Sequence, residues 1–421
     1  MFLIYLIIFI SAVPKHPWLG EEVGGFTLAK YLGVVCFLYA LLALSFRATL
    51  PVLFTTWPAR LFVALTAWGI ASCFFVSHAP EPLVLAQPFI SYFAIFFAIV
   101  TCVNSLRRLQ FAVLSLLGAL DLASLYFLRE YQKIGFGAAR ASGWVVGDGN
   151  YFACAALLTI PIAYYLIPST REQLLKWFYR TSLALTFLAV VFSASRGAFA
   201  GLCGVVAVTL FSSGNKYRAL FASALIVVAL LVSPVSPIKR ILDPEYGDNN
   251  STEAHEGLWK FGVRMALEHP LFGIGVGNFK SYTVVYHVTD NPTGFEGHNA
   301  YIHLAAETGF VGFLFYLGVN LSAILLLRQI QKAAVSMKHA YLYSLSVGMQ
   351  QGIIGFAVGA FFISAQSEKP FWIVISMVAA LVPIAETQWI RWKAQRQAHT
   401  PESASPEQPQ SEPDLVPSFA R

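Results

Sequence analysis

Long apolar runs recur along almost the whole chain, and they constrain its fold more than any other feature. Most runs are near or above the roughly 18 residues needed to cross the hydrocarbon core of a bilayer, and the first is shorter. Of the 421 residues, 57% are hydrophobic and only 12% are charged, so charged side chains are too few to cover a soluble globule. The sequence predicts about twelve spans, near residues 1–13, 26–46, 60–78, 83–103, 108–128, 151–168, 178–194, 197–212, 217–232, 299–327, 341–363 and 371–390.

These runs predict an all-α fold, a polytopic transmembrane helical bundle. Backbone inside a bilayer must satisfy its own hydrogen bonds, and the runs are far longer than the strands of a membrane barrel. The first run lacks the basic start and the cleavage site of a signal peptide, so we expect a retained helix. The predicted organisation is transmembrane helices 1–9 in residues 1–232, a large loop with short amphipathic helices in 233–297, helices 10–12 in 298–390, and a disordered tail rich in Pro, Ser, Gln and Glu in 391–421.

Lysine and arginine gather at alternate ends of the runs, which predicts the orientation of the chain. The positive-inside rule places the basic ends and both termini in the cytoplasm, and residues 233–297 in the periplasm. The formal net charge of +6 is mostly this bias, so we infer membrane lipids and no nucleic acid as partners. The residues concerned are Arg47, Arg60, Arg107, Arg108, Arg171, Lys176, Arg180, Lys216, Arg218, Arg328, Lys332, Lys338, Arg391, Lys393 and Arg396.

The predicted periplasmic loop contains most of the candidate chemistry. Between Glu253 and Glu268 apolar residues recur at helical spacing, and Pro270 should end the helix. This pattern predicts an amphipathic helix on the outer surface of the membrane. Charged residues recur every four positions on another face of this helix: Glu256, Lys260, Arg264 and Glu268. A solvated stripe of salt bridges is the alternative to a functional role, above all for Lys260.

A glycine-rich segment, Gly273 to Phe279, follows the predicted amphipathic helix. Such backbone can turn its N–H groups toward an anion, so Gly275 and Gly277 are candidate ligands of a phosphate. No strand precedes the segment, which excludes a Rossmann or P-loop role. A tight connection between two surface helices is the competing interpretation.

Ionisable groups also occur within or beside the apolar runs. Arg196 separates two runs with almost no loop, and such a group at the membrane boundary is a functional hypothesis, with snorkelling to headgroups as the alternative. His298 and Asn299 open the next run, where His298 could act as a base, a hydrogen-bond donor or a helix cap. His303 and Glu307 share a helix face four residues apart, and we expect a buried structural pair.

Four of these pieces occur in a familiar order. They are S-R-G at Arg196, W-x4-R at Trp259 to Arg264, H-P-L-F-G-I-G-V-G-N-F at His269 to Phe279, and H-N-x-Y-x3-A-A-E-T-G-x-x-G at His298 to Gly312. Together they resemble the O-antigen ligase and O-antigen polymerase family of bacterial membrane glycosyltransferases. The resemblance is strongest over residues 190–315, and elsewhere only hydropathy is shared.

The resemblance implies an enzyme of the bacterial inner membrane with a periplasmic active site. This enzyme would move a glycan from an undecaprenyl-diphosphate carrier to an acceptor hydroxyl, for which we favour the lipid A core. Arg196 and Arg264 match the arginines that are taken to hold the diphosphate in this family, and His298 matches the family's functional histidine. Arginine forks bind phosphate bidentately, and the outer loops contain no close D-x-D pair, so we expect an inverting reaction that needs neither metal nor cofactor.

Other acceptors and one other class of protein stay open. Polymerisation onto a second carrier-linked glycan ranks after ligation, and transfer to protein by an O-oligosaccharyltransferase ranks third, because no added periplasmic domain is visible to hold a protein. A transporter or flippase of lipid-linked glycan is the rival from another class. Transporters commonly contain paired repeats and helices broken at the midplane, whereas here polar residues gather at one outer face.

Overall fold

The computed structural model describes residues 1–13, 22–23, 26–45, 52–75, 82–134, 149–193, 195–212, 217, 220, 224, 249–289, 291 and 294–398. Apart from 217, 220 and 224, the predicted run at 217–232 lies outside the described residues, as do 233–248 and 399–421. Residues 233–248 at the start of the predicted periplasmic loop and most of the predicted tail are therefore not described.

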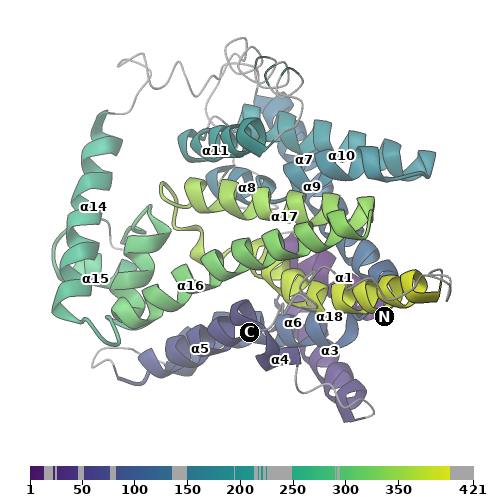
Figure 1. Cartoon of the computed structure of the whole chain (residues 1–421). Coiled ribbons are helices and arrows are strands. Elements are labelled where there is room, and N and C mark those ends of the chain that lie inside the picture. The colour runs from purple at the N-terminus through teal and green to yellow at the C-terminus, as the bar shows by residue number, and fades with distance from the viewer. Residues whose placement is uncertain are drawn as a thin grey trace.

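The first half of the chain forms a series of helices and one small hairpin (Figure 1). The elements are α1 (Phe2–Ala12), β1 (Glu22–Val23), β2 (Phe26–Thr27), α3 (Leu28–Ser45), α4 (Val52–Thr55), α5 (Trp57–Ser72), α6 (Pro82–Cys102), α7 (Leu106–Ile134), α8 (Gly149–Ala156), α9 (Thr159–Ser169), α10 (Gln173–Phe192) and α11 (Arg196–Ser212). In the hairpin, Val23 pairs antiparallel with Phe26. This two-residue ladder was not predicted, and it leaves the helical class of the fold unchanged.

The second half of the chain contains the longest helices and the elements nearest the predicted site. These are α14 (Asn249–Glu268), α15 (Phe279–Val285), α16 (Ala300–Ser336), α17 (Ala340–Gly359), the 3-10 turn η1 (Ala365–Ser367) and α18 (Lys369–Ala398). Figure 1 shows α14 and α15 together at one end of the bundle, where α14 runs across the direction of α16 and α17. The predicted amphipathic helix and its end before Pro270 are confirmed.

Six stretches of the described chain are long and apolar enough to cross a membrane. They are Leu85–Cys102, Leu106–Glu130, Gly149–Ser169, Gln173–Phe192, Ala300–Ser336 and Lys369–Gln397, and the shorter apolar helices are Phe2–Ala12, Leu28–Leu44 and Arg196–Phe211. The protein is therefore a multi-pass, helical membrane protein, as predicted. A total of about twelve spans stays a prediction.

Small residues let the helices around α17 approach one another closely. A Cβ atom added at Gly201 of α11 would lie 2.5 Å from the carbonyl oxygen of Gly355, and one added at Gly352 would lie 2.5 Å from that of Leu158. Because lipid chains are as apolar as leucine, helices in a membrane gain stability mainly from such close packing. Glycine at these positions fixes α11 and α9 against α17, and so fixes the position of the α11 N-terminus.

The long helix α16 is interrupted at Gly309, although the sequence predicted an unbroken run at 299–327. Gly309 has φ 68° and ψ −178°, a conformation that favours glycine. The segment after α14 covers the break, because Phe310 N donates to Pro270 O at 2.8 Å and Ile274 N donates to Ala306 O at 2.8 Å. Non-helical backbone in a membrane protein is tolerated where other protein groups satisfy it in this way.

Helix α18 continues to Ala398, past the boundary predicted at Arg391 for a disordered tail. The extension pairs cations with rings, since Lys393 Nζ lies 5.8 Å from the ring centroid of Trp389 and Arg396 Cζ lies 4.9 Å from that of Trp392. Cation–π contacts of this kind stabilise an exposed helix end. The predicted tail thus begins later than the sequence boundary suggested.

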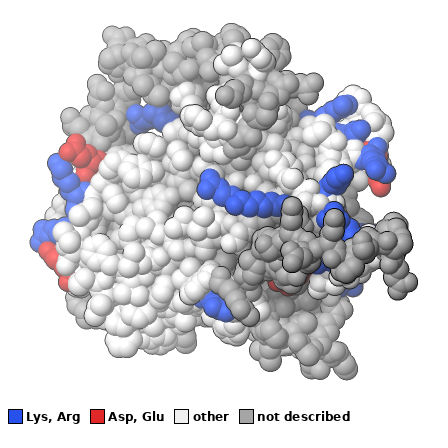
Figure 2. Space-filling view, viewed as in Figure 1, with Lys and Arg blue, Asp and Glu red and all other residues white. Residues whose placement is uncertain are grey.

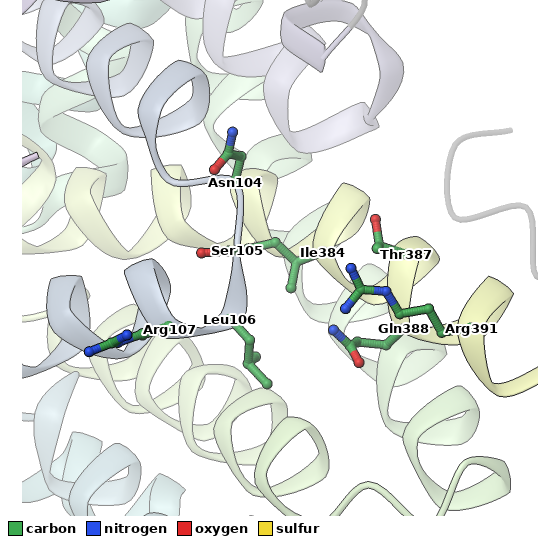
Figure 3. Close-up of a pocket in the computed structure, with 8 residues that line it drawn as sticks. All are labelled: Asn104, Ser105, Leu106, Arg107, Ile384, Thr387, Gln388 and Arg391. Atoms are coloured by element: carbon green, nitrogen blue, oxygen red, sulfur yellow. The ribbon is translucent and has the colours of Figure 1, made fainter.

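On the face drawn in Figure 2, charged side chains lie at the left and right edges, and a few Lys or Arg side chains lie between them on a mostly uncharged surface. One end contains α14, where Lys260 and Arg264 lie beside Glu256 and Glu268. At the other end, Arg107 from the first turn of α7 and Arg391 from α18 line one pocket of about 250 Å³ (Figure 3). Arg107 and Arg391, both predicted to be cytoplasmic, therefore share the end opposite α14.

Candidate functional site

Arg196 is the first residue of α11 and is held there by a network of serines. Ser195 Oγ accepts from Ala198 N at 3.3 Å, and Ser193 Oγ accepts from Ser195 N at 3.2 Å and donates to Val190 O at 2.7 Å. Ser195 therefore caps the helix N-terminus in the usual way. The side chain of Arg196 is half-buried at the end of the bundle that contains α14.

Asn299 is the N-cap of α16 and His298 precedes it, and the start of this helix is fixed to the C-terminal end of α17. Asn299 Oδ1 accepts from Tyr301 N and Ile302 N, both at 3.0 Å, while Ala300 N donates to Ala360 O at 2.9 Å. His298 has φ 45°, an uncommon backbone conformation for a residue other than glycine. Among the described residues Asn299 Nδ2 is buried without a hydrogen-bond partner, so capping uses only the oxygen of this side chain.

The structure adds one residue that the sequence analysis missed, His255 of α14. Its ring stacks on that of His298, with centroids 4.4 Å apart and planes 5° from parallel. Burial first, and then the nearby His298 and Arg196, lowers the pKa of His255 to about 4. The stack joins His255 of α14 to His298, which lies just before α16, and the effect on the pKa of His255 places Arg196 of α11 nearby; we call these three residues the histidine–arginine cluster.

A groove of about 650 Å³ begins one helical turn from this cluster. Trp259 lies four residues after His255, and its indole contacts Phe361 with ring centroids 5.6 Å apart. Ile302, four residues after His298, lines the same groove. The full lining consists of Glu256, Trp259, Lys260, Val263, Arg264, Leu267, Glu268 and Ile302. The groove thus combines apolar walls with two pairs of opposite charges.

Arg264 lies in this groove and not in the histidine–arginine cluster. Its Nε is 2.6 Å from Glu268 Oε1, and its side chain is 64% exposed. Lys260 makes the equivalent pair with Glu256 at 2.7 Å and is 77% exposed. Since α14 rises about 1.5 Å per residue, Arg264 lies roughly 13 Å along the helix from His255. The structure brings Arg196 and His298 to one place and leaves Arg264 about two and a half turns away.

The glycine-rich segment packs against α16 and is hydrogen-bonded to it. Gly275 and Gly277 both have φ 80°, which favours glycine. Glu307 Oε1 accepts from Phe279 N at 3.2 Å and lies 3.1 Å from His303 Nε2, so the pair expected from the sequence holds this segment on α16. The described contacts of the segment are with α16 and its neighbours. An anion-binding role for Gly275 and Gly277 stays a prediction.

Glu296 fixes the end of the loop to the bundle just before His298. Its carboxylate accepts from Tyr151 of α8 and forms an ion pair with Lys280 Nζ at 2.7 Å. Burial raises the pKa of Glu296, but the hydrogen bonds from Lys280 and Tyr151 outweigh burial and lower it overall. A charged Glu296 therefore anchors the chain on both sides, which limits movement of His298.

Comparison with known protein families gives one match to part of the chain. The family model described as O-antigen ligase matches residues 181–317, a stretch that extends from α10 into α16 and includes Arg196, His255, Arg264 and His298. The curated proteins searched include none that matches the chain. The resemblance inferred from the four motifs is thus confirmed, and over residues 181–317 this multi-pass membrane protein is similar to the O-antigen ligases.

Proposed function

We propose that the protein is an O-antigen ligase-like glycosyltransferase that moves a glycan from undecaprenyl diphosphate to a hydroxyl of the lipid A core. The histidine–arginine cluster is the observation that supports this function best. It joins a fixed positive charge, Arg196, to a titratable group, His298, at one end of a membrane bundle. Transfer from a diphosphate carrier needs both, because a leaving anion must be stabilised and a hydroxyl must lose its proton.

In the proposed reaction, the acceptor hydroxyl oxygen attacks the anomeric carbon of the glycan from the side opposite the diphosphate. The new C–O bond forms as the bond to the diphosphate oxygen breaks, and that electron pair leaves with the diphosphate. His298 accepts the hydroxyl proton, or orients the hydroxyl for attack, and Arg196 binds the diphosphate through its paired N–H donors. Attack from the opposite side inverts the anomeric configuration. Asn299 Nδ2 supplies a further donor near this centre.

Arginine performs the electrostatic role in this scheme, so we propose that the reaction needs no metal. Within the described part of the chain, no group of three His, Cys, Asp or Glu side chains has the arrangement that a metal ion would need. The test is direct, because chelation with EDTA leaves an arginine site intact and removes a magnesium or manganese ion.

Glycan analysis in a deletion strain tests the proposed function against its alternatives. Loss of a ligase leaves carrier-linked polymer that is not joined to the lipid A core. Loss of a polymerase leaves single repeat units on the core. Loss of a protein glycosyltransferase leaves both polymerisation and ligation to the core intact. Loss of a flippase leaves the lipid-linked precursor on the cytoplasmic side. Accumulation of unligated polymer supports the proposal, and each of the other patterns contradicts it.

Labelling of a single cysteine tests the proposed periplasmic location. Asn249 begins α14 at the end of the molecule opposite Arg107 and Arg391. In the variant Asn249→Cys, with the native cysteines replaced, an impermeant thiol reagent should react in intact spheroplasts. Reaction only after lysis would reverse the orientation and place the histidine–arginine cluster in the cytoplasm.

A further inference from the structure

His255 has no role in the function proposed above, yet it makes the closest described ring contact with His298. The two rings lie face to face, with centroids 4.4 Å apart and planes 5° from parallel. They come from α14 and the start of α16, which are separate elements. A ring contact of this geometry limits how the His298 imidazole can rotate about its side-chain bonds.

The parallel stack excludes proton transfer directly between the two histidines. The ring nitrogens of imidazole donate and accept hydrogen bonds in the plane of the ring. In two rings that are 5° from parallel and stacked face to face, the nitrogens of one do not point at the nitrogens of the other. His255 therefore acts on His298 through its aromatic face and its volume, and not as the second member of a proton relay.

The charge of His255 fits such a role. Burial, His298 and Arg196 together keep its pKa at about 4, so the ring is neutral near neutral pH. A neutral aromatic face attracts a cation above it, whereas a second imidazolium would repel it. His255 can therefore remain stacked on His298 both before and after His298 gains a proton.

We propose that His255 is a positioning residue for His298: it fixes the plane of that ring by stacking and offers an aromatic face to the imidazolium formed during transfer. This role rests on the proposed function for its catalytic consequence. It requires an aromatic ring at position 255 but no ring nitrogen. A residue that supplies a proton would instead need a ring nitrogen at this position.

A series of substitutions at position 255, made in the full chain in lipid nanodiscs, tests the role. His255→Phe keeps a ring of similar size, His255→Leu keeps only apolar volume, and His255→Ala keeps neither. We expect kcat near the wild-type value for His255→Phe, a loss of about tenfold for His255→Ala, and an intermediate value for His255→Leu. The donor KM should change little, because Arg196 remains in place. His269→Ala, at an exposed histidine beyond α14, is the matched control and should match the wild type.

Two results would overturn the proposal. Activity of His255→Phe as low as that of His255→Ala would show that a ring nitrogen is needed, and unchanged kcat in His255→Ala would show that the stack has no effect. A general packing role would instead lower the amount of folded protein in all three variants, at equal kcat per folded molecule. Membrane level and thermal midpoint are therefore measured for each.

A second readout is independent of catalysis. In protein with labelled histidine, the His298 ring signal is identified by its loss in His298→Gln, and a ring stacked above it shifts that signal upfield. We expect the shift to persist in His255→Phe and to disappear in His255→Leu and His255→Ala. If wild-type protein transfers no glycan, the proposed function fails while this comparison still tests the stack. An unchanged signal in His255→Ala contradicts it.

Discussion

The two ends of α14 present ionisable side chains in contrasting settings. Near its start, His255 is half-buried and contacts His298, a residue distant in the sequence. Near its C-terminus, Arg264 pairs with Glu268 four residues away, and its side chain is mostly exposed. One turn earlier, Lys260 pairs with Glu256 in the same way and is also mostly exposed. Charges that recur every four residues satisfy one another locally, whereas the cluster at the other end depends on groups brought together by the fold.

Of the substitutions that test this contrast, loss of the His298 side chain should lower glycan transfer the most. His298→Ala should lower transfer about 100-fold or more, the usual contribution of a general base, while the protein accumulates normally in the membrane. Complementation of a deletion strain, with the membrane level of each variant measured in parallel, gives the result. Wild-type transfer by this variant would remove the histidine–arginine cluster as the active site.

Arg196→Lys should have the next largest effect. Lysine keeps the positive charge but loses the planar fork that binds a diphosphate bidentately. Since a hydrogen bond to a charged group is worth roughly 1.5–3 kcal/mol, transfer should fall about tenfold or more. The readout is the donor dependence of transfer by purified protein. Full activity would show that Arg196 only reaches lipid headgroups.

Arg264→Lys distinguishes the two ends of α14 most sharply. The family resemblance predicts a diphosphate ligand here, but the structure shows an exposed arginine paired with Glu268. Because an exposed ion pair is worth roughly 0.2–1 kcal/mol, we expect a loss of less than about fivefold. A loss as large as that of Arg196→Lys, in the same assay, would return Arg264 to the diphosphate site and require α14 to move on substrate binding.

Lys260→Ala should have the smallest effect. Lys260 is 77% exposed and its described ion pair is with Glu256 on the same helix. Exposed substitutions of this kind usually change stability by less than about 0.5 kcal/mol, so transfer should stay within about twofold of the wild type. A strong loss of transfer in Lys260→Ala, together with mild losses in the Arg196 and His298 variants, would contradict the proposed site and place the active site in the groove.

Much of the framework was predictable from local sequence. Apolar runs predicted the helices, Pro270 marked the end of α14, and the polar pair His298-Asn299 marked the start of α16. These signals are local because a helix and its caps are defined by residues within a few positions of each other. The same reasoning predicted the His303–Glu307 pair, one turn apart on α16.

The parts that were missed depend on distant contacts. The stack of His255 on His298 joins two segments that only the fold brings together, and the sequence offers no more than the place of His255 one turn before Trp259. The break at Gly309 has one local signal, the glycine itself, and glycine is common in unbroken membrane helices. The exposure of Arg264 also emerged only from the structure, since its motif alone suggested a ligand.

The decisive measurement of the proposed active site is transfer by the purified protein, in the presence of EDTA, from undecaprenyl-diphosphate-linked glycan to a lipid A core acceptor. We expect the wild type and Lys260→Ala to transfer glycan under these conditions and His298→Ala to transfer none. Activity that disappears with EDTA and returns with magnesium or manganese would contradict the role given to Arg196. Equal transfer by His298→Ala and the wild type would contradict the site itself.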